Sequence, residues 1–266
     1  MIQQWYRIRE QKELAPSIYL MVFDAPELAK EAQPGQFINV YCKDKARLLP
    51  RPISIYDADA EAGTLSIIYA VVGDGTREFA AYGAGEELRV VGPLGHGFPM
   101  ERAEEAEEIF IVGGGLGIPP MQYLSKELHK KYPEKPIKCF LGYRSEPWIG
   151  DVFSQYGEVL NTSDDGACGF KGNVIDRMNA YLEGKDPNTA RVLYTCGPIP
   201  MMKGIQRWQG AYNIETWFSL EERMGCGFGA CAGCPAKLRM PDGSVKMEGV
   251  CKLGPVFPGK DVIFDE

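Results

Sequence analysis

Short apolar segments, separated by turns rich in glycine, proline and aspartate, dominate the first hundred residues of the chain. The pattern within them predicts β-strands over 18–24, 36–42, 63–73 and 86–95. No stretch of this region has a helical period of useful length, so we expect no substantial helix there. Closely spaced strands of this kind indicate a small antiparallel β-barrel or sandwich over residues 1–101.

The pattern changes after a short acidic connector. Residues 108–115 predict a buried strand that runs into a glycine-rich turn, and residues 118–132 carry apolar positions at helical spacing. Two more buried strands are predicted over 135–144 and 191–198. Strands that alternate with helices indicate an α/β domain with a parallel sheet over residues 102–214, which binds ligands at the carboxyl ends of its strands.

The last segment, residues 215–266, is rich in cysteine, glycine and turn residues. It is too short to bury a large core of its own, and segments of this size usually need a metal in order to fold. The chain is therefore expected to be multidomain, with two modest domains followed by a small metal-binding segment.

Charge and cysteine content narrow the function classes. The net charge of -7 argues against nucleic acid or an anionic membrane as the main partner. The chain has no apolar run of the roughly 18 residues that a membrane span requires, and its N-terminus lacks the apolar core of a signal peptide. We therefore expect a cytoplasmic protein, where structural disulfides are rare. Four scattered cysteines are expected to behave as small, mostly buried residues: Cys42, Cys139, Cys168 and Cys196.

The other four cysteines form a motif. Cys226, Cys231 and Cys234 have the spacing C-x4-C-x2-C, and Cys251 follows downstream. This is the plant-type spacing for a [2Fe–2S] cluster, and the small residues between the cysteines let backbone amides approach the sulfur atoms. The alternative is a structural zinc site. Zinc ligands, however, usually come as two C-x2-4-C pairs rather than as three in one loop.

A glycine-rich turn predicts a nucleotide site in the second domain. Gly115, Gly117 and Pro120 form a Gly-x-Gly-x-x-Pro pattern between a strand and a helix. Glycines let the backbone turn tightly against a diphosphate, and a proline in the first helical turn leaves no amide hydrogen unused. The alternative is an ordinary strand-to-helix turn.

A second turn supports the first. Cys196, Gly197 and Pro198 end a later strand and precede a short helix, so they face the same edge of a parallel sheet. Together the two turns resemble those of the ferredoxin-reductase family, which binds nicotinamide nucleotides here. The resemblance implies that Cys196 lies close to the nicotinamide, whereas a buried thiol at a strand end remains the alternative.

The same family binds FAD on a Greek-key barrel through an Arg-x-Tyr-Ser motif. Here the corresponding residues are Arg51, Pro52, Ile53 and Ser54. The resemblance implies that Arg51 pairs with the FAD diphosphate, as a guanidinium does in two-pronged fashion. It also implies that Ser54 bonds to the flavin ring or its ribityl chain. Ile53 departs from the usual aromatic residue, which puts stacking of this side chain on the flavin in doubt.

A strand and turn further along match the family's next flavin contact. Ile68, Tyr69 and Ala70 occupy the strand that runs along the cofactor in the family, and Gly75 and Thr76 follow in the turn. The resemblance implies that the Gly-Thr amides and hydroxyl reach the diphosphate. A plain hairpin turn is the alternative.

The whole chain resembles the electron-transfer subunits of bacterial dihydroorotate dehydrogenase B. Its most specific features are "EERMGCGFGACAGC" and "GVCKLGPVF". The resemblance implies an FMN-containing catalytic partner that oxidises dihydroorotate, in a heterotetramer with two of each subunit. Electrons would pass through the [2Fe–2S] cluster and FAD of this chain to NAD+, in de novo synthesis of pyrimidine (UMP). No catalytic acid–base residue is then expected on this chain.

Several alternatives stay open. Flavin subunits of NAD(P)H–ferredoxin or sulfide dehydrogenase complexes resemble this chain, although they often replace one cluster cysteine. An oxygenase reductase and a zinc-stabilised binding module are more distant possibilities. The family favours NAD over NADP, but Arg144 stands where it could contact a 2′-phosphate or the adenine. His96 follows the barrel and could approach the cofactors.

Overall fold

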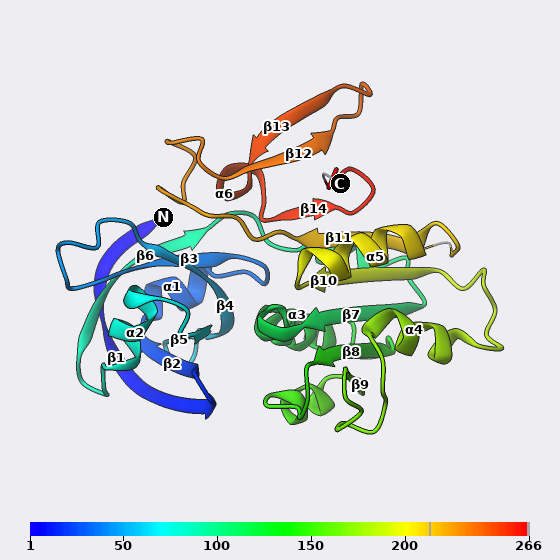
Figure 1. Ribbon diagram of the computed structural model, residues 1–266, viewed down its shortest axis with the longest axis horizontal. Coiled ribbons are helices and arrows are strands. Elements are labelled where there is room, and N and C mark those ends of the chain that lie inside the picture. The colour runs from blue at the N-terminus through cyan, green and yellow to red at the C-terminus, as the bar shows by residue number, and fades with distance from the viewer. Residues whose placement is uncertain (213, 265–266) are drawn as a thin grey trace.

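The N-terminal domain is a closed antiparallel barrel in a computed structural model that describes residues 1–212 and 214–264 (Figure 1). The barrel order is β1-β2-β5-β4-β3-β6, so β6 returns to lie beside β3 and completes a Greek key. The Greek-key barrel is therefore confirmed, and each predicted strand is present together with two more. The strands are β1 (Ile2–Ala15), β2 (Ile18–Asp24), β3 (Phe37–Tyr41), β4 (Arg51–Asp59), β5 (Thr64–Ala70) and β6 (Glu87–Leu94).

Two short helices close the barrel ends, where the sequence led us to expect none. Helix α1 (Pro26–Glu31) and helix α2 (Asp74–Ala80) have six and seven residues. Helices of two turns or less are too short to display a 3.6-residue period, which is why the pattern did not predict them.

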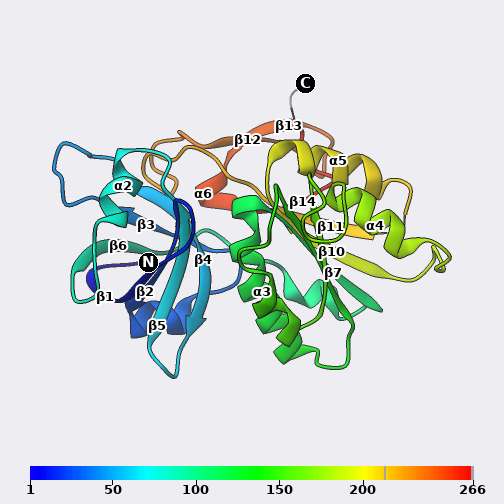
Figure 2. The ribbon, with the colours of Figure 1, turned by 60° about the horizontal axis from the view of Figure 1, so that its bottom comes forward.

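The second domain is a six-stranded sheet with helices on both faces (Figures 1 and 2). Its order is β14-β11-β10-β7-β8-β9, and only β14 is antiparallel. Helix α3 packs on one face, and α4 and α5 pack on the other. The strands are β7 (Glu108–Gly114), β8 (Ile137–Tyr143), β9 (Glu158–Ser163), β10 (Arg191–Cys196), β11 (Ile214–Ser219) and β14 (Val256–Pro258). The helices are α3 (Ile118–Lys131), α4 (Val174–Leu182) and α5 (Ile199–Gln209), with short 3-10 turns η1 (Met100–Ala103), η2 (Gly115–Gly117) and η3 (Gly150–Gln155).

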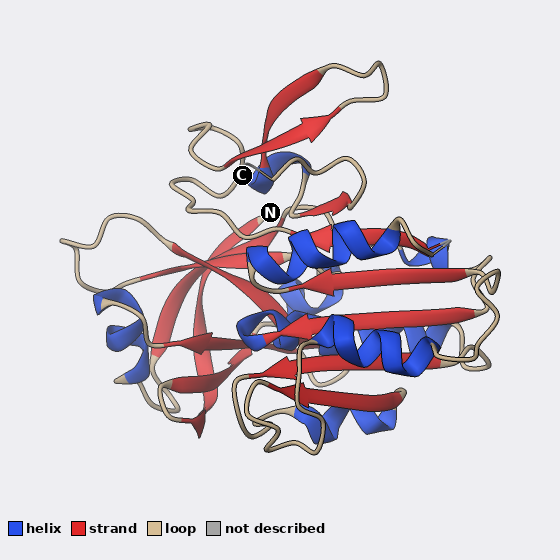
Figure 3. Ribbon diagram, turned by 45° about the vertical axis from the view of Figure 1, so that its right-hand side comes forward, coloured by secondary structure: helices blue, strands red, loops and turns tan. Residues whose placement is uncertain are grey.

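The C-terminal segment crosses above both domains. It holds a hairpin of β12 (Pro235–Arg239) and β13 (Val245–Gly249), followed by α6 (Val250–Leu253), and the hairpin projects from the top in Figure 3. The predicted boundary between residues 214 and 215 falls inside β11, the last parallel strand of the sheet. Because β14 also returns to this sheet, the cluster segment shares its core with the second domain.

Polar contacts between α3 and the barrel join the domains. Lys126 Nζ lies 2.7 Å from Asp57 Oδ1, and the Tyr123 hydroxyl donates to the carbonyl of Ala32 at 2.9 Å. Partial burial makes such an ion pair less screened than a fully exposed one. Within the described ranges, no helix is both long and apolar enough to cross a membrane.

Candidate functional site

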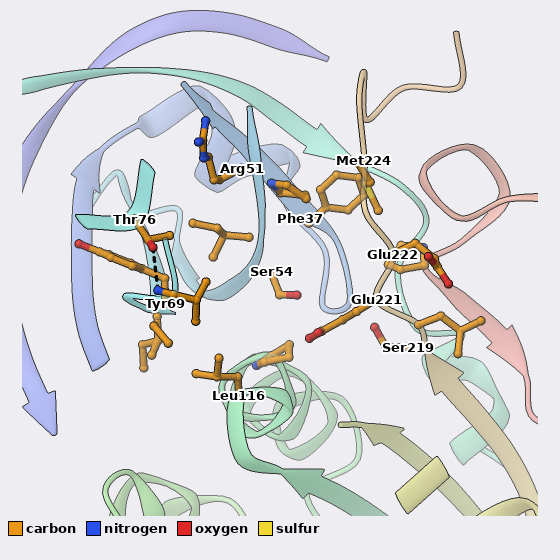
Figure 4. Close-up of a pocket in the computed structure, with 18 residues that line it drawn as sticks. Phe37, Arg51, Ser54, Tyr69, Thr76, Leu116, Ser219, Glu221, Glu222 and Met224 are labelled. Atoms are coloured by element: carbon orange, nitrogen blue, oxygen red, sulfur yellow. Dashed lines mark hydrogen bonds between the residues drawn. The ribbon is translucent and has the colours of Figure 1, made fainter. Parts of the chain in front are cut away.

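A cavity of about 300 Å³ lies where the barrel, the glycine-rich turn and the segment after β11 meet (Figure 4). Its size is in the range of small-molecule sites. Some of its apolar lining side chains are exposed to solvent: Val72 is 83% exposed and Leu116 is 42% exposed. Nine residues that the sequence singled out line this cavity: Arg51, Pro52, Ile53, Ser54, Ile68, Tyr69, Ala70, Thr76 and Pro120.

Arg51 and Gly75 form a matched pair at the barrel end of the cavity. A Cβ on Gly75 would lie 2.5 Å from Nη2 of Arg51, and closer still to its Nε and Cζ. The guanidinium therefore rests directly on the glycine, with Nη1 donating to the Leu49 carbonyl at 2.6 Å. This arrangement leaves a bidentate cation beside the first turn of α2, which fits a diphosphate group.

Thr76 lines the cavity with its hydroxyl already engaged. Its Oγ1 accepts hydrogen bonds from the amides of Val72 and Gly73 and donates to the Gly73 carbonyl. The hydroxyl thus stabilises the turn that begins α2, and the role that the sequence assigned to it at a diphosphate remains a prediction.

Aromatic surface comes from positions other than Ile53. Tyr69 on β5 and Phe37 on β3 both line the cavity, and β3 pairs Phe37 with Ser54 in register. Tyr69 stacks on Tyr19, with ring centroids 5.9 Å apart. The cavity therefore offers apolar and aromatic walls with the Ser54 hydroxyl among them, a combination that suits a planar, partly polar ring such as a flavin.

The two predicted nucleotide turns pack against each other at the carboxyl ends of β7 and β10. A Cβ on Gly117 would lie 2.5 Å from the Gly197 amide nitrogen, and one on Gly114 would lie 2.7 Å from Met201 Sδ. Gly115 has φ +52°, a backbone conformation that favours glycine. The turn at Gly115 and Gly117 and the turn from Cys196 to Pro198 thus share one crevice edge, as expected for a parallel sheet.

Cys196 is fully buried and is not among the residues that line the cavity. Burial, followed by the nearby Glu221 carboxylate, raises the pKa of its thiol well above the usual range. Its neighbour in register on β11 is Ser219, which does line the cavity. The direct contact with nicotinamide that the family resemblance implies for Cys196 therefore remains a prediction.

The sequence did not predict the cavity-lining residues at the end of β11 and directly after it. Ser219, Leu220, Glu221, Glu222 and Met224 line the cavity opposite the barrel. In Figure 4, Glu221 extends into the cavity on the side of Ser54. Its carboxylate is open to the cavity, yet the surrounding protein desolvates it and raises the pKa of Glu221. Recognition of β11 would have found them, since a parallel strand that ends at residue 219 places the residues after it at the carboxyl edge of the sheet, where ligands bind.

The four motif cysteines lie together in the C-terminal segment. Backbone amides point at several of their sulfur atoms, as expected for the predicted [2Fe–2S] cluster. The Ala230 amide donates to Cys226 Sγ at 3.2 Å, and the Gly229 amide donates to Cys251 Sγ at 3.1 Å. Amides aimed at sulfur stabilise thiolates and bound cluster sulfur atoms.

The thiols associate in two pairs. The side chains of Cys226 and Cys231 form a hydrogen bond, and so do those of Cys234 and Cys251, without a disulfide in either pair. Desolvation raises the pKa of Cys226, but the donors around its sulfur outweigh this and lower it to about 6. Burial and then the neighbouring Cys234 raise the pKa of Cys251 to about 12. Two pairs of cysteine thiols fit a [2Fe–2S] cluster, in which each of the two irons takes two cysteine ligands.

His96 contacts the cluster segment rather than the cavity. Its Nε2 lies 3.0 Å from the carbonyl oxygen of Lys252, and its amide donates to the Gly254 carbonyl. The residue therefore helps to hold α6 against the barrel, next to Cys251.

Comparisons with known proteins agree with this geometry. Residues 221–263 match the family model of the iron-sulfur cluster binding domain of dihydroorotate dehydrogenase B. Over 257 residues, the chain is 37% identical to the electron transfer subunit of dihydroorotate dehydrogenase B (NAD(+)) from Bacillus cereus (strain B4264), covering 95% of each chain. The subunit from Bacillus anthracis (strain CDC 684 / NRRL 3495) has the same identity and coverage.

Solved structures show the same architecture. An NADH-dependent reduced ferredoxin-NADP oxidoreductase, studied for flavin-based electron bifurcation, superposes with a TM-score of 0.82 at 29% identity, covering 97% of this chain and 89% of that one. A ferredoxin NADP+ reductase from Neisseria gonorrhoeae with bound FAD and NADP superposes with a TM-score of 0.64 at 17% identity, covering 82% and 99%. The second likeness concerns the fold alone.

Proposed function

The chain belongs to the family of electron-transfer subunits of dihydroorotate dehydrogenase B, and from this we propose that it conducts electrons between a dihydroorotate-oxidising partner and NAD+. When bound, the [2Fe–2S] cluster supplies one-electron transfer, and FAD links it to the two-electron chemistry of the nicotinamide. The family name and the four-cysteine motif support this proposal together. Oxidation of dihydroorotate itself is assigned to the partner.

The observation that carries the proposal is the closeness of the three sites. Phe37 of β3 lines the flavin cavity, Pro120 of the nucleotide turn lines the same cavity, and Met224 of the cluster segment completes it. Met224 also packs against the hydrophobic core that contains Cys234 and Cys251. The residues that we predict for the nucleotide, the flavin and the cluster therefore lie on neighbouring segments, which supports the proposal.

The residues of the chain have distinct tasks in this proposal. Arg51 binds the FAD diphosphate, with Gly75 leaving room for its guanidinium. Ser54 and Glu221 are the hydroxyl and carboxyl groups that face each other across the cavity, where a proton could be held beside the flavin ring. The turns at Gly117 and Gly197 bind the dinucleotide backbone.

The partner is expected to dock over the cluster loop, in a heterotetramer of two catalytic and two electron-transfer subunits. Exposed apolar side chains support a protein contact there: Phe228 in the loop is 49% exposed, Leu253 in α6 is 43% exposed, and Met247 in β13 is 59% exposed. Electron transfer requires the cluster to lie near the partner's FMN, so an interface on this side is consistent with the function. The four cysteines outside the cluster motif form no disulfide in the described part of the chain, which is consistent with the cytoplasmic location that we propose.

A second candidate function rests on the likeness to the NADH-dependent ferredoxin-NADP oxidoreductase, which has a TM-score of 0.82. In that case the partner would handle ferredoxin or another electron carrier instead of dihydroorotate. The cofactor sites of this chain would be the same in both cases, so only the partner distinguishes them.

Anaerobic purification of the tagged chain from its native host, with whatever binds it, tests the proposal. Dihydroorotate-dependent reduction of NAD+, by a preparation that contains an FMN-bearing partner, is the expected result. A yellow-brown complex that oxidises NADH but not dihydroorotate would favour the second candidate.

A further inference from the structure

One strand of the barrel connects the flavin cavity to the cluster loop. Ile38 and Val40 of β3 point into the barrel core, so Phe37 and Asn39 share its outer face. Phe37 lines the cavity, whereas Asn39 contacts the cluster loop. With a rise of about 3.4 Å per residue, these two positions are separated by about 7 Å along the strand.

Asn39 makes one specific contact with the first cluster ligand. Its side chain is fully buried, and Nδ2 donates to the carbonyl oxygen of Cys226 at 2.8 Å. The register of the barrel pairs Asn39 with Pro52, inside the flavin motif of β4. Its Oδ1 has no hydrogen-bond partner among the described residues, so this one bond to Cys226 must offset much of the cost of burying the amide.

The lack of a side chain at Gly227 leaves space for the side chain of Asn39. A Cβ at this position would lie 2.9 Å from Cγ and 3.0 Å from Oδ1 of Asn39, and closer still to Nδ2. Gly227 also has φ +78°, a conformation that side chains rarely adopt. The side of Gly227 that a methyl group would occupy therefore faces Asn39, and the glycine is needed for the contact with the barrel.

We propose that Asn39 is a positioning residue that fixes the first cluster ligand relative to the flavin site and raises the reduction potential of the cluster. The hydrogen bond holds the Cys226 backbone at a set distance from β3 and β4. The N–H group also neutralises part of the negative charge on the Cys226 carbonyl oxygen, which belongs to the residue that would bind a centre that becomes more negative on reduction. His96 holds the carbonyl beside Cys251 in the same way, but it does so from an exposed position.

The first test replaces Asn39 with leucine, which has the same number of side-chain heavy atoms and the same branching but no donor. In the anaerobically purified holoprotein, we expect a more negative midpoint potential of the cluster, an altered EPR spectrum of the reduced cluster, and an unchanged FAD potential. Loss of iron to a ferrous chelator should be about tenfold faster, the lower end of the effect of losing an outer-shell partner.

Two further variants keep the result interpretable. Gly227→Ala should reproduce the EPR and potential changes by displacing the Asn39 amide, even if Asn39→Leu does not accumulate as a folded protein. Asn161→Leu is the matched control, because Asn161 is also a strand asparagine with an unpartnered Oδ1, on β9 at the far edge of the sheet.

The proposal is overturned if Asn39→Leu or Gly227→Ala binds a cluster with unchanged EPR spectrum, potential and iron release. It is also overturned if Asn161→Leu shifts the cluster potential equally, because the effect would then be general loosening of the fold.

Discussion

Replacing Gly75 with alanine is expected to weaken FAD binding while leaving the barrel as stable as before. Gly75 lies in the first turn of α2, its backbone has no left-handed φ, and alanine is the better helix former by about 1 kcal/mol. The new methyl group, however, would occupy the space of the Arg51 guanidinium, which must then move away from its position in the cavity.

The size of the effect follows from what Arg51 loses. Hydrogen bonds to charged groups contribute about 1.5–3 kcal/mol, and displacement of the guanidinium forfeits at least one of them with the FAD diphosphate. That range corresponds to an increase in the Kd for FAD of about 10- to 150-fold. The free energy of unfolding of the apoprotein should stay the same or rise slightly.

The assay is a titration of apoprotein with FAD, followed by quenching of flavin fluorescence, beside urea unfolding of the same apoprotein. Gly83→Ala is the control, since a Cβ there meets nothing within 4 Å. An unchanged Kd for FAD in Gly75→Ala would refute the role of Arg51. A large loss of apoprotein stability would refute the reasoning about α2.

Three further predictions follow from the site and its surroundings. Cys231→Ser should abolish dihydroorotate-to-NAD+ turnover in the complex yet spare NADH oxidation by a dye that accepts electrons from FAD, and intact turnover would contradict the cluster assignment. Glu78→Gln should destabilise the barrel by about 1 kcal/mol at pH 7, because Glu78 accepts hydrogen bonds from the Tyr82 hydroxyl, the amides of the loop at 43–44 and Arg47. Desolvation opposes these donors, but together they lower the pKa of Glu78 below its ordinary 4.5. The stability that the Glu78 carboxylate contributes is therefore present above pH 4.5 and is lost as the pH falls through the lowered pKa. In urea unfolding, the difference in stability between wild type and Glu78→Gln should shrink below pH 4.5. Arg144 is exposed and follows β8. If Arg144 contacts only the adenine, Arg144→Ala should change kcat/KM for NADH and NADPH by the same factor. A selective loss with NADPH would show a 2′-phosphate contact.

Local signals were sufficient for most of the fold. Strand alternation predicted the barrel, and the switch from strand to helical spacing at 108–132 predicted the parallel sheet; both are confirmed. The cysteine spacing predicted the iron–sulfur segment that the family model also identifies. These features depend on residues close in sequence, which is why a single chain reveals them.

The rest depends on contacts between distant segments. Strand β11 was not predicted, and the predicted boundary falls inside it, because six residues beside a cysteine-rich segment carry little pattern of their own. Without β11, Glu221 could not be placed at the cavity. Asn39 was equally hidden, since its partner Cys226 is 187 residues away and a single polar residue in a strand usually has no such role.

The most direct test of the account is EPR of the cluster after rapid freezing of the anaerobic complex with dihydroorotate and no NAD+. The account predicts that the reduced [2Fe–2S] signal appears within the time of one turnover and disappears when NAD+ is added. A cluster that stays oxidised while the complex converts dihydroorotate to orotate would contradict it.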